Sequence, residues 1–89
     1  MAKFHFSLVS PERELYAGEV DQVDAPGAEG DFGVLEGHEP FMTTLRSGQV
    51  IVTVGAGARR VFEIQGGFAD VTPESFTLLA EHATEIAAA

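Results

Sequence analysis

The sequence predicts an all-β domain, an antiparallel sandwich or barrel, and three observations lead to this prediction. Apolar and polar residues alternate with a period of two through most of the chain, as they do along half-buried strands. The alternating runs are short, and turns that contain glycine or proline separate them. A length of 89 residues with 45% hydrophobic residues suits one folded domain, which we place at residues 1–89.

Four segments carry the alternation most clearly, beginning with the strand that opens the chain. In each of them every second residue is apolar, so these residues share one face of a strand. The sets are Phe4, Phe6 and Leu8; Val50, Val52 and Val54; Phe62 and Ile64; and Phe76, Leu78 and Ala80. The spacing also predicts that Phe68 packs in the core with Phe4, Phe6, Phe62 and Phe76.

Glycine and proline mark the connections between these strands. Residues 55–57 (Gly-Ala-Gly) predict a hairpin tip, which Arg59-Arg60 would cap, and residues 72–74 (Thr-Pro-Glu) predict a turn. The pair Gly66-Gly67 predicts a bulge or a close crossing of strands.

Two regions are less regular. Val20 and Val23 lie three residues apart, which breaks the alternation and predicts a bulge or kink between Leu15 and Ala25. The tail His82–Ala89 is rich in alanine, but eight residues are too few for an isolated helix. We predict a last strand that ends in a frayed segment.

The charge of the chain restricts its partners. Five Lys and Arg against fourteen Asp and Glu give a net charge of −9 at pH 7, which repels nucleic acid and anionic lipid. A basic protein surface is the favoured partner. No apolar run approaches the roughly 20 residues of a membrane span. The absence of cysteine excludes disulfides and thiolate metal sites.

The segment Pro26–Leu45 is the first candidate for a functional region. It concentrates glycines, which mark positive φ angles or close backbone approach, and we predict that Gly33 and Gly37 set turns. The same segment contains His38 and four carboxylates that face either solvent or a basic partner. These carboxylates are Glu29, Asp31, Glu36 and Glu39.

The sequence nominates no catalytic residue, metal site or cofactor. His38 lies between Gly37 and Glu39 without a nucleophile in view, so a structural hydrogen bond is its expected role. The three histidines lack metal-ligand spacing, and no glycine run leads into Lys-Ser or Lys-Thr. One rival is a stand-alone module that binds a basic peptide or small ligand at the glycine-rich end. A weaker rival is a metal-free hydrolase that uses His38 with Asp31 or Glu36.

Four segments together resemble a known family. They are FSLVSPERELYAGEV (residues 6–20), PGAEGDFGVLEGHEPFMTTLRSGQV (26–50), GGFADV (66–71) and TLLAEHA (77–83). In this order they resemble the N-terminal domain of the epsilon subunit of bacterial F-type ATP synthase, above all in the pattern GDFGVLxGHxPxxTxLxxG. The resemblance covers nearly the whole chain.

The resemblance implies a flattened sandwich of ten strands and a non-catalytic role in the central rotor. In that family the domain binds the gamma subunit and rests on the c-ring, and so helps couple proton flow to ATP synthesis. It also implies a peripheral position at the cytoplasmic face of the bacterial inner membrane, without direct lipid insertion. The isolated chain is expected to be a monomer.

The resemblance also implies two contact regions. Phe41 and Met42 are both candidates for contact with the gamma subunit. Met42 is the stronger candidate, because the Phe41 side chain could instead pack inward. Gly37, His38 and Pro40 are expected on a turn at the same end of the sandwich as the loop around Asp31. The c-ring contacts implied are Glu29, Gly30, Asp31, Phe32, Gly37, His38 and Pro40. The gamma contacts implied are Ser10, Pro11, Phe41, Met42, Thr43 and Thr44.

The chain departs from the family's pattern at its C-terminal end. Members usually continue into a two-helix hairpin that binds ATP and blocks rotation, whereas this sequence stops at Ala89. Either the subunit lacks the hairpin or the chain is an excised domain. Inhibition and ATP binding are therefore not expected of it, and the coupling role is.

Overall fold

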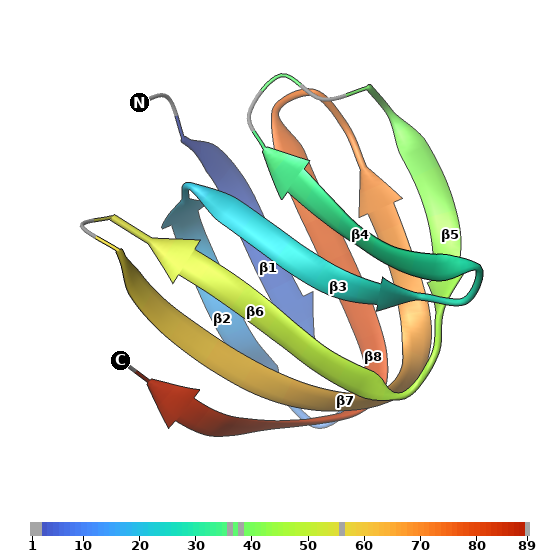
Figure 1. Cartoon of the computed structure of the whole chain (residues 1–89). Helices are drawn as coiled ribbons and strands as arrows, with labels where there is room; N and C mark the ends of the chain where they lie inside the picture. Colours follow the sequence, from blue (N-terminus) through green and yellow to red (C-terminus); the bar gives the residue numbers. More distant parts are fainter. Residues whose placement is uncertain (1–2, 36, 38, 56, 89) are drawn as a thin grey trace.

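Eight β-strands make up the fold (Figure 1), in a computed structural model that describes residues 3–35, 37, 39–55 and 57–88. The all-β prediction is confirmed. Within the described residues, no helix is long and apolar enough to cross a membrane. The strands are β1 (Phe4–Val9), β2 (Glu14–Val20), β3 (Gln22–Gly27), β4 (Gly30–Leu35), β5 (Phe41–Leu45), β6 (Gly48–Val54), β7 (Ala58–Val71) and β8 (Ser75–Ala88).

The strands form two layers. In the first layer β2 pairs with β1, β1 with the start of β8, β8 with the end of β7, and β7 with β5. In the second layer β4 pairs with β3, β3 with β6, β6 with the start of β7, and β7 with the end of β8. Among the pairings of the described strands, β1 with β8 is parallel and the others are antiparallel.

The two long strands belong to both layers. β7 and β8 are 14 residues each, and Figure 1 shows them curving together from one layer into the other. β7 pairs with β6 through Ala58–Ile64 and with β5 through Gly67–Val71. The expectation of ten strands is therefore wrong, because each long strand continues through the bend at which it changes layer.

The core lies between the layers and contains four of the phenylalanines predicted there. Phe4, Phe6, Phe62 and Phe76 are at most 1% exposed. Phe68 is half-buried and lies on the outer face, so the prediction for this residue is wrong. The even-numbered residues of β7 point inward before Gly66-Gly67 and the odd-numbered ones after it, as the buried pairs Phe62, Ile64 and Ala69, Val71 show.

The predicted turns are confirmed, since Gly55 and Gly57 lie between β6 and β7, and residues 72–74 lie between β7 and β8. Ala56 lies outside the described residues. The predicted kink is also present. β2 ends at Val20, β3 begins at Gln22, and the intervening Asp21 donates its backbone N–H to the Thr53 oxygen at 2.8 Å. This break lets Val20 and Val23 both face the core.

Two local predictions are wrong. Gly33 sets no turn and lies inside β4, opposite Asp24, where an added Cβ would come within 2.8 Å of the Asp24 carboxylate. The tail is not frayed, because β8 continues to Ala88 and pairs there with Arg60 of β7.

Candidate functional site

The glycine pair of β7 creates the most distinctive surface feature of the molecule. Gly66 and Gly67 have φ angles of 72° and 147°. A Cβ on Gly67 would lie 2.3 Å from the backbone oxygen of Leu79 in β8, so a side chain cannot fit there. The two long strands therefore approach each other closely at the bend and leave the outer surface above Gly67 without a covering side chain.

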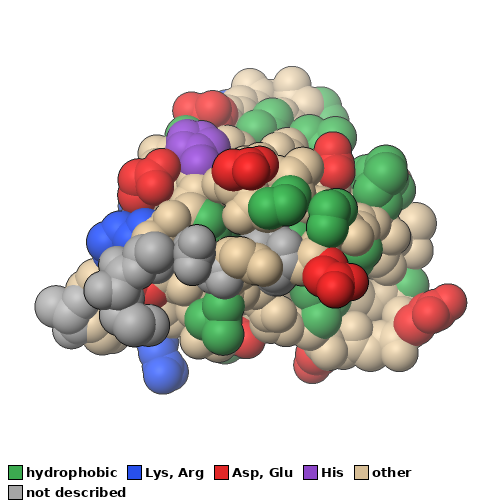
Figure 2. All heavy atoms as spheres, turned by 90° about the horizontal axis from the view of Figure 1, so that it is seen from above, with side chains coloured by type: hydrophobic (Ala, Val, Ile, Leu, Met, Phe, Trp, Pro, Cys, Tyr) green, Lys and Arg blue, Asp and Glu red, His purple; other side chains and the backbone are tan. Residues whose placement is uncertain are grey.

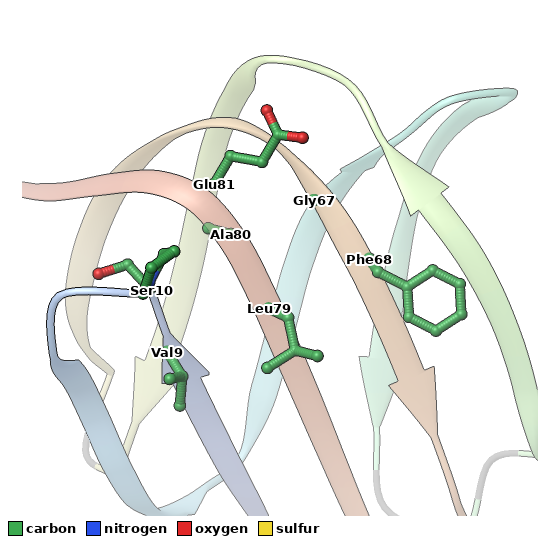
Figure 3. Close-up of a pocket in the computed structure, with 8 residues that line it drawn as sticks. Val9, Ser10, Gly67, Phe68, Leu79, Ala80 and Glu81 are labelled. Carbon is green, nitrogen blue, oxygen red and sulfur yellow. The ribbon is translucent and has the colours of Figure 1, made fainter.

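A hollow of about 440 Å³ lies over this bend. Its lining comes from the end of β1, the turn after it, β7 and β8, and Figure 3 shows the Leu79 side chain standing between Val9 and Phe68. The lining residues are Val9, Ser10, Pro11, Gly67, Phe68, Leu79, Ala80 and Glu81. Most of these are apolar, although the hollow opens to solvent.

Strand register extends this apolar surface across the first layer. Val9 lies opposite Leu79, Leu79 opposite Phe68, and Phe68 opposite Thr44 of β5. Directly opposed residues share a face, and residues two positions along are also within reach of long side chains. Met42 is diagonal to Phe68, because it lies two positions from Thr44 on β5. Met42 is 63% exposed and Leu79 is 50% exposed, so both offer apolar surface to a partner.

The structure separates the residues expected to contact gamma. Pro11 is exposed at the edge of the hollow, and Met42 and Thr44 face outward from β5 beside it. Thr43 and Phe41 point to the other side of β5, since they oppose the buried Ala69 and Val71. This surface therefore contains some of the expected residues and not others.

Ser10 lines the hollow but is only 7% exposed. Its hydroxyl donates to the Arg13 backbone oxygen and to Glu12 Oε1, both at 3.2 Å, and its backbone N–H donates to the Arg13 oxygen at 2.9 Å. These bonds close the turn between β1 and β2. Ser10 therefore shapes the edge of the hollow more than it offers a side chain to a partner.

Sequence reasoning missed Leu79 and Phe68 as surface residues of this face. Leu79 was visible as the apolar residue on the polar side of its strand, between the inward-facing Leu78 and Ala80. Phe68 was hidden because the alternation changes phase at the glycine pair. If the inward-facing positions of β7 had been allowed to change from even to odd numbers at Gly66-Gly67, Phe68 would have been assigned to the outer face, as Leu79 is.

The second feature is the hairpin tip, which we define as residues 28–31. Ala28 and Glu29 form the turn between β3 and β4, and both are exposed. Asp31 has a side chain that is 72% exposed and forms an ion pair with Arg46, from the connection between β5 and β6. Glu29 and Asp31 thus project into solvent, as their expected role requires, but Asp31 already has a cationic partner within the chain.

Backbone bonds hold this connection to the hairpin independently of the ion pair. Ala28 donates its N–H to the Thr44 oxygen and Arg46 donates its N–H to the Pro26 oxygen, both at 3.0 Å. The Arg46 side chain is 51% exposed. It can therefore leave Asp31 without any rearrangement of the backbone that presents the tip.

Phe32 does not lie on the tip surface. Its ring stacks on Phe76 at a centroid distance of 6.2 Å and meets Phe41 edge-on at 5.3 Å. These contacts fill the space between β4 and β5, which are not paired with each other in the described residues. The structure therefore gives Phe32 a packing position, and it turns the Phe41 ring toward the same packing.

The remaining residues expected at the c-ring lie elsewhere. Gly37 and Pro40 are exposed and follow the last residue of β4, whereas the hairpin tip lies at the start of that strand. Five residue steps of a strand span roughly 17 Å. The expectation that both turns share one end of the sandwich is therefore wrong. His38 and Glu36 lie outside the described residues.

Acidic side chains dominate the charged surface. In the face seen in Figure 2 they lie among hydrophobic side chains, while basic side chains gather at one side.

Arg60 does not cap the hairpin as expected. Its guanidinium pairs with Glu85 at 2.7 Å and lies over the Tyr16 ring, 5.0 Å from the centroid. The hydrogen bond from Arg60 lowers the pKa of Glu85.

Comparison with known proteins identifies the class of domain. Residues 3–86 match the family model of the ATP synthase delta/epsilon chain β-sandwich domain. The ATP synthase epsilon chain of Caulobacter vibrioides is 71% identical over 87 residues, which cover 98% of this chain and all of that one. The epsilon chain of Hyphomonas neptunium is 60% identical over 84 residues, 94% of this chain and 62% of that one.

Solved structures agree with this match. A chain of the Euglena gracilis mitochondrial ATP synthase, in a structure of its OSCP, F1 and c-ring, superposes with a TM-score of 0.89 at 25% identity. The match covers 96% of this chain and 54% of that one. This protein therefore belongs to the family of the ATP synthase epsilon chain, and it spans a little under two thirds of relatives such as that of Hyphomonas neptunium.

Proposed function

We propose that this chain is a non-catalytic subunit of the central rotor of a proton-translocating ATP synthase. In this role it binds the gamma subunit through the outer face of the first layer and the c-ring through the hairpin tip. It turns with both as part of the rotor, at the cytoplasmic face of the bacterial inner membrane. The observation that carries the proposal is an exposed apolar face on a domain whose family is that of the epsilon chain.

The apolar face supports the gamma contact. Interface centres are depleted in charged residues and enriched in aromatic residues and methionine. Leu79, Phe68 and Met42 give this face such a composition, and they come from three neighbouring strands. A large exposed side chain such as Met42 gains stability when a partner removes it from water.

The hairpin tip supports the c-ring contact. Glu29 lies on the two-residue connection between β3 and β4, and Asp31 is the second residue of β4; both are exposed. Hydrogen bonds to β5 and to the connection after it fix the backbone around them. An exposed carboxylate pair of this kind suits a basic loop. Its contribution is expected to lie mainly in the rate and specificity of association.

Sedimentation of the chain with the gamma subunit of the same organism tests the proposal. We expect a one-to-one complex that persists when both proteins are diluted to about 1 µM, which corresponds to roughly −8 kcal/mol of binding free energy. An oligomer of the chain alone would obscure this result, so the chain is first run by itself. Independent sedimentation of the two proteins at about 50 µM would contradict the gamma contact.

A further inference from the structure

We propose that the hollow over the glycine bend receives an apolar side chain of the gamma subunit, and that Glu81 at its rim and Asp70 on the same face meet basic side chains near that residue. This inference rests on the function proposed above and specifies the chemistry of the partner surface. To fill the hollow, the partner must present a side chain that projects from its surface, whereas a flat apolar surface is enough to cover the rest of the face.

The walls of the hollow determine what fits inside. Leu79 and Phe68 stand on opposed positions of β8 and β7, and Val9 lies on the other side of Leu79. The floor is the backbone at Gly67, where no side chain can be added. A polar or charged group placed there would lose water contacts without gaining partners, so an aliphatic or aromatic side chain is the matching occupant.

The rim determines the charge around that occupant. Glu81 lines the hollow, and its carboxylate lies over Gly66, with Oε1 3.3 Å from the position of a Cβ there. Asp70 does not line the hollow, but it lies opposite Met42 and therefore faces the same side of the sheet. Among the described residues neither carboxylate has a recorded ion pair, whereas Asp21, Asp31 and Glu85 each have one.

The extent of the apolar surface favours a protein over a small molecule. The hollow falls within the roughly 300–1,000 Å³ of small-ligand sites, so its volume alone does not decide between the two. The apolar row, however, continues beyond the hollow to Met42 on β5. A ligand confined to the hollow would leave this side chain exposed, whereas a protein surface covers both.

Leu79→Ala tests the apolar occupant, with Ile86→Ala as the matched control. Both residues are aliphatic, lie on β8 and are about half exposed, at 50% and 47%. Only Leu79 lines the hollow. Titration calorimetry with the gamma subunit should show binding weakened roughly tenfold or more by Leu79→Ala, the scale of a central interface residue, and unchanged by Ile86→Ala.

Glu81→Gln tests the basic neighbours, with Glu63→Gln as the control. Both glutamates are exposed, but Glu63 lies in the second layer, opposite Gln49 of β6. Glu81→Gln should weaken gamma binding by up to about fivefold at low salt, and the difference should vanish near 0.5 M salt because exposed pairs are screened. Glu63→Gln should follow the wild type at every salt concentration.

The outcomes separate the two proposals. A wild-type chain that does not bind gamma overturns both the proposed function and this inference. A wild-type chain that binds gamma, with Leu79→Ala no weaker than Ile86→Ala, overturns only the occupancy of the hollow. Equal salt dependence of Glu81→Gln and the wild type overturns the basic rim. Thermal unfolding of each variant, expected to match the wild type at these exposed positions, ensures that affinities of folded proteins are compared.

Discussion

Arg60 and Glu85 form a two-pronged ion pair that joins the start of β7 to the end of β8. Arg60 Nε donates to Glu85 Oε2 and Nη2 donates to Oε1, both at 2.7 Å. The guanidinium also lies 5.0 Å from the Tyr16 centroid and 5.5 Å from that of Phe62, so it links β2 to this pair. Parallel bonds of this geometry are stronger than those of a single-point contact.

The first prediction concerns the pH dependence of this pair. The pKa of Glu85 is lowered from its ordinary value of 4.5, first by the hydrogen bond from Arg60 and then by its charge, against an opposing effect of desolvation. A lowered folded-state pKa gives stability that is present above about 4.5 and is lost as the pH falls through the folded value. Glu85→Gln should therefore lower the melting temperature at pH 7, and this deficit should shrink steadily below pH 4.5.

Glu74→Gln is the control for this measurement. Glu74 lies on the exposed turn between β7 and β8, and no side-chain partner is recorded for it in the described part of the chain. Its melting curve should follow that of the wild type over the whole pH range. A Glu85→Gln deficit that stays constant from pH 7 to about pH 3 would show that the side chain acts by packing and not by charge.

The second prediction concerns the glycine bend. Gly67→Ala places a Cβ 2.3 Å from the Leu79 backbone oxygen, in a backbone conformation with φ of 147°. The clash is with backbone atoms, so it can be relieved only if the backbone of β7 or β8 moves. We therefore expect a loss of about 3 kcal/mol in the free energy of unfolding. Gly57→Ala has a φ of 78° but open space around the added carbon, and it should cost only about 1–2 kcal/mol. Urea titration measures both, and equal losses would contradict the close approach.

The third prediction concerns the hairpin tip and the proposed c-ring contact. Arg46→Gln removes the internal partner of Asp31 while its backbone N–H can still bond to the Pro26 oxygen. We expect tighter binding to purified c-ring at low salt and a stability change within about 1 kcal/mol, since exposed pairs contribute little.

The reverse change should weaken ring binding. Replacing Glu29 and Asp31 together by lysine reverses both charges of the tip, and the exposed positions of these residues leave the fold intact. Co-sedimentation with the c-ring should then be lost, and proton-driven ATP synthesis by the reconstituted enzyme should fall. Normal synthesis with both lysines in place would refute the proposed role of the tip.

The fourth prediction separates packing from contact at Phe32. Its ring lies between the rings of Phe76 and Phe41, so Phe32→Ala should lower the free energy of unfolding by about 3 kcal/mol. Phe41→Ala should cost less, because the Phe41 side chain is 39% exposed. Denaturant titration compares the two. A Phe32→Ala variant that is as stable as the wild type but no longer binds the c-ring would show instead that Phe32 acts as a contact residue.

Local alternation was enough to predict the class of fold and much of the core. Phe4, Phe6, Phe62 and Phe76 were assigned from a period of two, and each is buried. The same rule failed at Phe68, because two glycines change the phase of the alternation and no local signal says which face follows. It also could not divide β7 into its two layers, since that depends on pairing with β5 and β6.

The candidate site was less accessible to sequence reasoning. Met42 and Pro11 were nominated and lie on or beside the hollow, but Leu79 was not, because their proximity depends on the order β1–β8–β7–β5 in the sheet. The pairing of Asp31 with Arg46 was hidden for a similar reason. The two residues lie 15 positions apart and meet only because β5 returns to the end of β3.

The sharing of β7 and β8 between the layers has a mechanical consequence. A sandwich made of separate sheets can shear, since only side-chain packing resists sliding of one sheet over the other. Here a force applied at the hairpin tip enters β3 and passes through the hydrogen-bonded pairs β3–β6 and β6–β7 to the first half of β7. From there it reaches the hollow along the covalent backbone of β7. Sliding would require the bend at Gly66-Gly67 to deform, which the close contact with Leu79 opposes. Such a domain resists shear between its two layers, which is what the proposed role in the rotor requires.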